Sequence, residues 1–310
     1  MLQNISSVGQ QFLANLETLD QSMATTQEQL SSGTTINKPS DNPAELGDVL
    51  QLESELGQAN QVSANLGIVS GEVNTAESAL ETATQLMSQA QSVGAQGATG
   101  TASASTRADL SQQAEDILSQ MVSISQTQFN GSYVFSGDQD TQPSYQLDLS
   151  SPTGVDQLIT TTATRQIQDV TGVTFADAKT AQQIFDDRNP DGTPAADNVF
   201  AAVNSLRLAL ANNDQTGITN ALASLQSASD YLSQQLSFYG GVQNQITNAT
   251  DVAQKFQLQY QTELGNLKDT NVASAAVSLS EEQASLQAAT QAEASMPRTT
   301  LFDFLTGSSG

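Results

Sequence analysis

The sequence contains no cysteine, no histidine and no tryptophan among its 310 residues. Without cysteine the chain can form neither disulfides nor thiolate metal sites, and without histidine it lacks the commonest general base and metal ligand. The densest groups of charge are carboxylates in a loop. We therefore expect no enzyme activity, no catalytic residue, no cofactor and no metal centre.

Positive charge is also scarce, since nine Lys and Arg stand against 33 Asp and Glu, which gives a formal net charge of −24. Such a chain repels phosphate backbones and anionic lipid, so we expect neither nucleic acid nor membrane as a partner. The amino terminus lacks a basic segment followed by an apolar core, and no apolar run approaches the ~18 residues of a membrane span. If the protein leaves the cell, we expect it to use a route other than a cleaved signal peptide.

Apolar residues make up 37% of the chain and aromatic residues 5%, which is little for two conventional cores and suits narrow seams between long helices. The longest predicted seam runs through residues 215–267, where apolar residues recur at a spacing of seven. Heptad spacing sustained this long is typical of a coiled coil, and it requires partner helices along its length. One row of this seam is Ile218, Leu225, Leu232, Tyr239, Ile246, Ala253, Tyr260 and Leu267, and the other includes Leu222, Leu236 and Leu264.

Other segments have matching helical periodicity. Helices are predicted over about 3–32, 44–95, 106–129, 199–210 and 269–296. The second of these, with Leu66, Val73, Leu80 and Met87 alternating with small residues, is the first candidate partner for the long seam. Gly240-Gly241 interrupts the long seam, and we expect either an intact but bendable helix, which we favour, or a close approach of another backbone.

Two non-helical segments carry their own patterns. Lys38-Pro39-Ser40-Asp41-Asn42-Pro43 predicts a turn in which Asp41 or Asn42 caps the next helix, rather than a ligand site. Alternating residues in 145–149, 158–164 and 165–170 predict short strands of a β insert. The insert is rich in turns and acidic residues and has no continuous apolar seam, so we expect the helical core to tolerate its replacement by a short linker.

Acidic side chains gather at residues 186–197 around Pro190-Asp191-Gly192. Oxygen-rich loops of this kind can hold Ca²⁺, but the spacing lacks the closing Glu of a twelve-residue calcium loop and Arg188 lies inside the cluster. We therefore favour a solvated turn over a calcium site.

These patterns predict a mainly α fold with a small β insert, in which the amino- and carboxy-terminal regions pair as long antiparallel coiled-coil helices. The expected parts are an amino-terminal axial helix (1–40), rod helices (41–137), an outer β-rich insert (138–196), further rod helices (197–268) and a carboxy-terminal axial helix with its tail (269–310).

Several segments together resemble the flagellin superfamily. They are Ile5 to Gly33, the 38–43 turn, 73–80 (VNTAESAL), 128–137 (QFNGSYVFSG) and 300–305 (TLFDFL). Flagellin itself usually has a second acidic residue and Ala where this chain has Asn42-Pro43, and it lacks the Tyr-x-Phe-x-Gly strand of residues 133–137. The resemblance is therefore closer to the hook-associated branch of the superfamily, whose members join the flagellar hook to the filament.

The resemblance implies a structural protein of the bacterial flagellum that is needed for motility, is located outside the cell and is exported by the type III apparatus. Its implied partners are copies of itself in a ring, a neighbouring hook-associated protein, flagellin and an export chaperone. Gln283, Gln287 and Gln291 would face an export channel. The implied assembly interface comprises Ile5, Phe12, Leu16, Leu19, Met23, Leu30, Val272, Leu279, Leu286, Leu301, Phe302, Phe304 and Leu305.

Two alternatives remain open at the level of the sequence. The chain is a filament flagellin, or it is a secreted coiled-coil effector or adhesin that acts as a soluble binding module. Self-assembly through both termini distinguishes a junction protein from a binding module.

Overall fold

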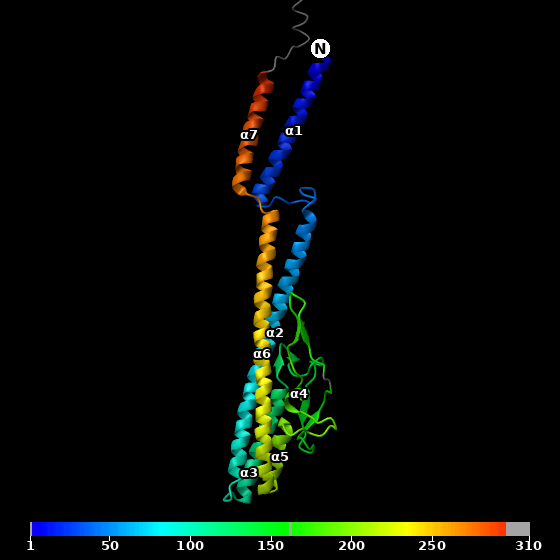
Figure 1. The fold of residues 1–310 in the computed structure, drawn as a ribbon. Coiled ribbons are helices and arrows are strands. Elements are labelled where there is room, and N and C mark those ends of the chain that lie inside the picture. Colours follow the sequence, from blue (N-terminus) through cyan, green and yellow to red (C-terminus); the bar gives the residue numbers. More distant parts are fainter. Residues whose placement is uncertain (1, 161–162, 296–310) are drawn as a thin grey trace, which may run out of the picture. The chain divides into compact units, whose positions relative to one another are not determined.

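The computed structural model describes residues 2–160 and 163–295, and helices dominate it (Figure 1). The helices are α1 (Leu2–Ser32), α2 (Leu46–Gly97), α3 (Ala104–Ser125), α4 (Ala181–Phe185), α5 (Val199–Ala211), α6 (Gln215–Lys268) and α7 (Val272–Ser295). The strands are β1 (Gln128–Phe129), β2 (Ser132–Tyr133), β3 (Tyr145–Leu147), β4 (Val155–Gln157), β5 (Gln166–Gln168) and β6 (Thr174–Ala176). The predicted fold class, mainly α with a small β insert, is confirmed.

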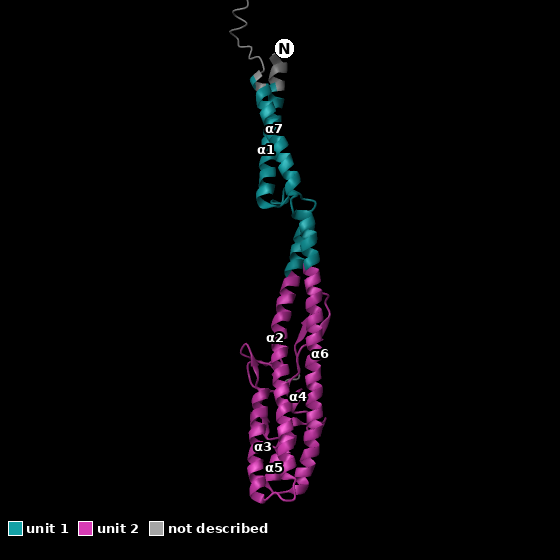
Figure 2. Cartoon of the chain, turned by 90° about the vertical axis from the view of Figure 1, so that its left-hand side faces the viewer, with its two compact units in different colours: residues 1–57, 258–310 teal, residues 58–257 magenta. Residues whose placement is uncertain are grey.

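The chain forms two compact units (Figure 2). The first contains residues 1–57 and 258–310, and the second contains residues 58–257. The division falls within α2 and within α6, so both helices contribute residues to each unit. The division of the chain into axial, rod and outer parts stays a prediction.

In the second unit, α2 and α6 lie side by side and run antiparallel. The amide Nε2 of Gln91 donates to the carbonyl of Leu225 at 3.4 Å, and that of Gln243 donates to Asn74 Oδ1 at 2.6 Å. Residue numbers thus fall along α2 as they rise along α6. The prediction that α2 is a partner of the long seam is confirmed.

The long seam is the buried face of α6. One of its rows, from Ile218 to Ala253, lies in the core, while Leu222 and Leu236 of the other row are partly buried. The facing row of α2 alternates large buried residues with Ala76, Ala83 and Ala90. Small residues at these positions let the two helices approach closely.

Two shorter helices complete this bundle. α3 packs against α5, and Ser103 caps the start of α3 by accepting a hydrogen bond from the backbone N–H of Thr106. α3 ends at Ser125, before the predicted end near residue 129, because the chain then enters the β1–β2 hairpin. Asn130 and Gly131 in its turn have φ values of +50° and +87°. Two successive positive φ angles are those of a type I′ turn, which favours Asn-Gly.

The β insert consists of separate two-stranded antiparallel pairs, β3 with β4 and β5 with β6. The strand predicted over 158–164 is wrong for residues 158–160 and 163–164, because the partner of β3 is at Val155–Gln157; residues 161–162 lie outside the described residues. The cause is a tight turn at Gly154, where φ is +78° and an added Cβ would lie 2.6 Å from Leu118 Cδ2. This turn returns the chain at once, so that Leu147 pairs with Val155.

The insert is part of the core of the second unit. Tyr145, Val155, Ile184 and Phe185 are buried in one cluster with the bundle helices. The ring of Tyr145 lies 5.2 Å from that of Phe200 in α5, measured between centroids. The expectation that the helical core tolerates replacement of the insert therefore rests on a wrong premise, since short strands contribute large buried side chains without any continuous seam.

Gly240 and Gly241 lie within an unbroken α6, as the favoured alternative predicts. A Cβ added at either position would have nothing within 4 Å. The close approach of another backbone is therefore wrong as the reason for these glycines.

Candidate assembly interface

In the first unit, α1 and α7 pack against each other, and their near ends are tied by backbone hydrogen bonds. The N–H of Thr35 donates to the carbonyl of Lys268 at 2.6 Å, and the N–H of Thr270 donates to the carbonyl of Gly33 at 2.9 Å. These bonds place the end of α1 beside the start of α7. The two helices are therefore antiparallel, as the sequence predicts.

The apolar stripe of α1 faces α7 but is only half covered. Within the predicted interface, the half-buried side chains are Phe12, Leu16, Leu19, Met23 and Leu30 on α1 and Leu279 and Leu286 on α7. Val272 is 57% exposed, and the buried residue of the first turn of α7 is Ala275. Two helices alone leave part of this stripe open to solvent.

Further apolar residues lie outside the predicted stripe. Leu13 of α1 is 62% exposed and Val277 of α7 is 58% exposed. Sequence reasoning missed both because they fall off the seven-residue rows. Ile5 lies in α1, but its side chain is outside the described part of the structure, and Leu301, Phe302, Phe304 and Leu305 lie outside the described residues.

A carboxylate lies between the two helices. Glu282 Oε1 accepts hydrogen bonds from the hydroxyls of Ser22, at 2.5 Å, and Thr26, at 3.3 Å. Thr26 is buried, and Glu282 Oε2 is a buried atom without a hydrogen-bond partner in the structure. The sequence contained a signal for this contact, since Thr26 lies three residues after Met23 on the packed face of α1.

The glutamines predicted to face a channel, Gln283, Gln287 and Gln291, are exposed on α7. The side of α7 that carries Glu282, Leu286 and Ala289 is the half-buried one. These amides are therefore open to solvent on α7, and their role as a channel wall stays a prediction.

The 38–43 turn connects α1 to α2 by side-chain hydrogen bonds to the backbone. Asp41 Oδ2 accepts from the N–H groups of Lys38 (2.7 Å) and Asn37 (2.9 Å), and these bonds lower the pKa of Asp41 below its ordinary value. Asn42 Oδ1 accepts from the N–H of Glu45 at 3.4 Å, so Asn42 caps the approach to α2. The predicted turn and cap are confirmed, and Lys38 pairs with Glu28 at 2.7 Å.

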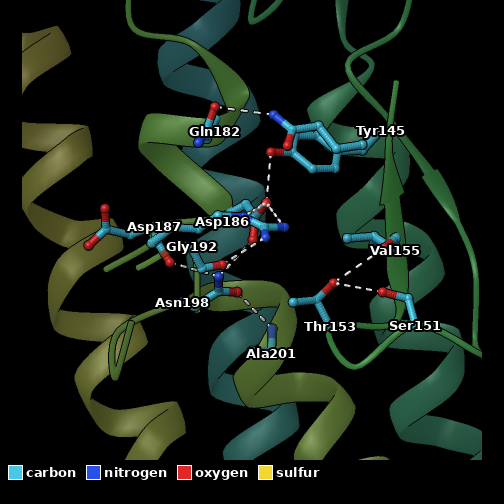
Figure 3. Close-up of polar contacts among 12 residues, drawn as sticks. Tyr145, Ser151, Thr153, Val155, Gln182, Asp186, Asp187, Gly192, Asn198 and Ala201 are labelled. Carbon is cyan, nitrogen blue, oxygen red and sulfur yellow. Dashed lines mark hydrogen bonds and ion pairs between the residues drawn. The ribbon is translucent and has the colours of Figure 1, made fainter. Parts of the chain in front are cut away.

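The acidic loop of the insert is organised by a buried carboxylate (Figure 3). Asp186 Oδ2 accepts from the hydroxyl of Tyr145 at 2.9 Å and from Arg188 Nη2 at 2.7 Å, and Oδ1 accepts from Asn198 Nδ2 at 2.7 Å. Asp186 has no exposed surface, so the predicted solvated turn is wrong for this residue. Its oxygens serve internal donors, and no cluster of metal-ligating side chains occurs within 2–160 and 163–295.

Nearby carboxylates lie on the edge of this network. Burial and the neighbouring Asp197 raise the pKa of Asp187. The hydroxyl of Tyr231 donates to the carbonyl of Gln183 at 2.6 Å, and burial raises the pKa of Tyr231 to about 12. These contacts join the acidic loop to α4 and α6, so the side chains that form them have a structural role.

Among the helices of the described chain, none combines the length and apolar character needed to cross a bilayer.

Residues 4–140 match the family model described as the bacterial flagellin N-terminal helical region. A Vibrio parahaemolyticus protein assigned as a flagellar hook-associated protein aligns with a TM-score of 0.64 at 18% identity, over 74% of this chain and 100% of that one. The Xanthomonas campestris FlgL structure aligns with a TM-score of 0.59 at 14% identity, over 69% and 99% of the two chains. This chain has the fold of the flagellar hook-associated proteins.

A third structure, the flagellar junction protein FlgL from Legionella pneumophila, aligns with a TM-score of 0.54 at 14% identity, over 65% of this chain and 99% of that one. No curated protein matches the sequence significantly. At these identities the likeness to the hook-associated proteins is one of fold. The resemblance to the flagellin superfamily is confirmed by the family model across the amino-terminal helices.

Proposed function

We propose that this chain is a structural junction protein of the bacterial flagellum, which joins the hook-associated zone to the flagellin filament and is needed for motility. The observation that carries the proposal is the half-covered apolar stripe of the α1–α7 pair, in a chain with the fold of hook-associated proteins. Further helices from neighbouring subunits would complete the burial of Phe12, Leu16 and Leu19.

The apolar stripe is the part of these helices that carries no charged side chain. α1 and α7 have no basic residue, and the carboxylate between them, Glu282, already accepts two hydrogen bonds. The exposed surface of the pair is mostly amide, hydroxyl and Ala. Exposed carboxylates also lie on this pair, at Glu17, Asp20, Glu28 and Glu281, so copies of a chain with a net charge of −24 meet at the least electrostatic cost along the apolar stripe itself.

The partners in this proposal are copies of the chain in a ring, a neighbouring hook-associated protein, flagellin and an export chaperone. The protein would act outside the cell body as part of the flagellum, after export without a cleaved signal peptide. The proteins of similar fold described above are hook-associated and junction proteins, which favours this role over a filament flagellin or a soluble adhesin.

Replacing Phe12 and Leu19 together by Asp tests the role of α1. Each substitution would place an unpaired carboxylate in the completed interface, at a cost of several kcal/mol. We expect the double variant to keep the circular dichroism and unfolding of the second unit but to lose attachment to purified hooks in negative-stain images and to lose complementation of motility.

Asn15→Asp with Gln21→Asp is the matched control, because it adds the same charge at exposed positions of α1. This control should retain more attachment than the apolar-site variant. Normal filament growth with Phe12→Asp and Leu19→Asp in place would show that the proposed role of α1 is wrong.

A further inference from the structure

An ion cluster fastens the open end of the β5–β6 hairpin to the helical bundle. Arg165, one residue before β5, forms an ion pair through Nη2 with Glu72 of α2. Its Nε lies 3.9 Å from Oδ2 of Asp177, which is one residue after β6. One cation therefore lies between two carboxylates, and the three groups carry a net charge of −1.

The two carboxylates of the cluster are buried, whereas the Arg165 side chain is 36% exposed, and the cluster is incompletely hydrogen-bonded. Glu72 is 8% exposed and Asp177 is 3% exposed. Neither Arg165 Nε nor Asp177 Oδ1 has a hydrogen-bond partner. A distance of 3.9 Å is too long for a hydrogen bond, so Asp177 is desolvated without full compensation.

A second attachment lies next to the cluster. The N–H of Lys179 donates to the hydroxyl of Tyr239 at 3.1 Å, and its Nζ donates to Gln235 Oε1 at 2.7 Å. The same Nζ lies 4.7 Å from the centre of the Phe238 ring. The hairpin's open end is thus fixed to both α2 and α6.

Farther along the hairpin, Ile167 and Phe175 pack against the core of the bundle. A groove of about 410 Å³ lies between the hairpin and α6. It is lined by Asp169, Val173, Thr174 and Phe175 of the hairpin segment and by Gln245, Asn248, Ala249 and Val252 of α6. Val173, at the turn, is 60% exposed. The strand ends of the hairpin are therefore fixed to the helices, while its turn is exposed beside the groove.

We propose that the β5–β6 hairpin is a proton-controlled flap, which the cluster of Arg165, Glu72 and Asp177 holds more firmly against the bundle when Asp177 is protonated. Protonation removes the excess negative charge and leaves Arg165 paired with Glu72. The flap would then cover the groove more tightly in acid than at neutral pH.

The direction follows from the surroundings of Asp177. Burial raises its pKa, and Arg165 opposes this rise. The Glu72 carboxylate raises the pKa of Asp177 further, and the phenol of Tyr239 on α6 also lies near Asp177. The carboxylate of Asp140 raises the pKa of Arg165. A carboxyl with a higher pKa in the closed state binds its proton more tightly there, so closure is favoured as pH falls through that pKa.

Hydrogen exchange of the hairpin amides, corrected for intrinsic rates, tests the proposal between about pH 4 and pH 7. Asp177→Asn should raise protection of the hairpin at pH 7 and remove most of its pH dependence. Each unit by which the pKa of Asp177 is raised corresponds to a tenfold change in protection. Glu72→Gln, which removes one charge that raises the pKa of Asp177 and leaves Arg165 with only Asp177, should weaken the preference for the protonated form.

Asp156→Asn on β4 is the matched control, since it makes the same change at an exposed position of the insert. It should leave the pH dependence of the β5–β6 amides unchanged. Lower hairpin protection in Asp177→Asn, or an unchanged pH profile, would overturn the proposal. So would equal changes in the hairpin and in α2 and α6, because the cluster would then be an ordinary part of the core.

Discussion

Asp186 is a buried carboxylate that connects several parts of the insert. It has no exposed surface and accepts hydrogen bonds from Tyr145, Arg188 and Asn198 (Figure 3). Asn198 also caps α5, since its Oδ1 accepts from the N–H of Ala201 at 2.8 Å. One carboxylate thus connects a strand, a loop and the start of a helix.

We expect Asp186→Ala to lower the free energy of unfolding of the second unit by about 2–4 kcal/mol, because it leaves buried donors without an acceptor. Tyr145→Phe removes one donor only and should cost about 1–2 kcal/mol. Denaturant unfolding followed by circular dichroism measures both. Asp191→Ala, in the same loop but exposed, should change stability by no more than about 0.5–1 kcal/mol; an equally large loss there would contradict the assigned role of Asp186.

Tyr239 makes the stability of the second unit depend on pH in the alkaline range. Burial raises its pKa well above the ordinary 10.0, and its hydroxyl accepts a hydrogen bond from the N–H of Lys179. The unfolded chain releases this proton near the ordinary pKa while the folded chain retains it. Stability is therefore fully present below about pH 10 and falls as pH rises further.

Tyr239→Phe should flatten that alkaline decline, although it costs about 1 kcal/mol at neutral pH through the lost hydrogen bond. Thermal unfolding of both proteins from pH 8 to pH 11 gives the comparison. A decline of the same steepness in the variant would show that other groups control alkaline unfolding.

Among the elements, the long helices were predictable, whereas the strands were predictable only in part: β3 and β5 lie within predicted segments, and β4 does not. The rows on α2 and α6 repeat over many turns, so a few misplaced residues do not hide them. The β3–β4 pair has three residues in each strand, and its position depends on the turn at Gly154, which packs against Leu118 and Asn204. Such contacts join residues far apart in the sequence, and the local periodicity of the sequence cannot predict them.

The same limit applies to the candidate site. The stripe from Phe12 to Leu30 was found because it follows the helical repeat. Leu13 and Val277 were missed because exposed apolar residues off the rows have no periodic signal. Burial of Asp186 was missed because its partner Tyr145 lies 41 residues away.

Replacement of residues 140–193 by a Gly-Ser linker tests the insert as an element. Although closing the loop costs little, the replacement removes Tyr145, Val155 and Phe185 from the core. Loss of a single large aromatic side chain costs about 3–5 kcal/mol. We expect the second unit to unfold or to lose cooperative unfolding, measured by calorimetry.

The control is a replacement confined to the exposed residues 189–193, which should leave unfolding cooperative. A linker variant that melts as sharply as the parent would restore the sequence-based expectation that the insert is dispensable.

At the scale of the whole molecule, the two units differ in how well they are packed. The second unit contains a continuous buried core. In the α1–α7 pair the apolar stripe is half exposed, and α7 is rich in Ala with few large apolar side chains. Isolated helices with little tertiary packing are marginal in water. The unassembled chain should therefore open first at α1 and α7.

Limited proteolysis with mass spectrometry should cleave within α1 and α7 first and leave a resistant fragment of about 45–265. Assembly onto hooks should slow the cleavage, because neighbouring subunits would cover the stripe. Equal resistance of the end helices and the core in the monomer would contradict this account.

The hydrogen bond between Ser22 and Glu282 joins residues 260 positions apart. Ribosomes add about 5–20 residues each second, so α1 emerges roughly 10–50 s before the helix that covers it. The second unit, residues 58–257, can fold during that interval, while α1 has no α7 to pack against. The order of synthesis therefore makes the first unit the last to fold. During most of its synthesis the chain exposes the apolar stripe of α1, which is then accessible to other binding partners.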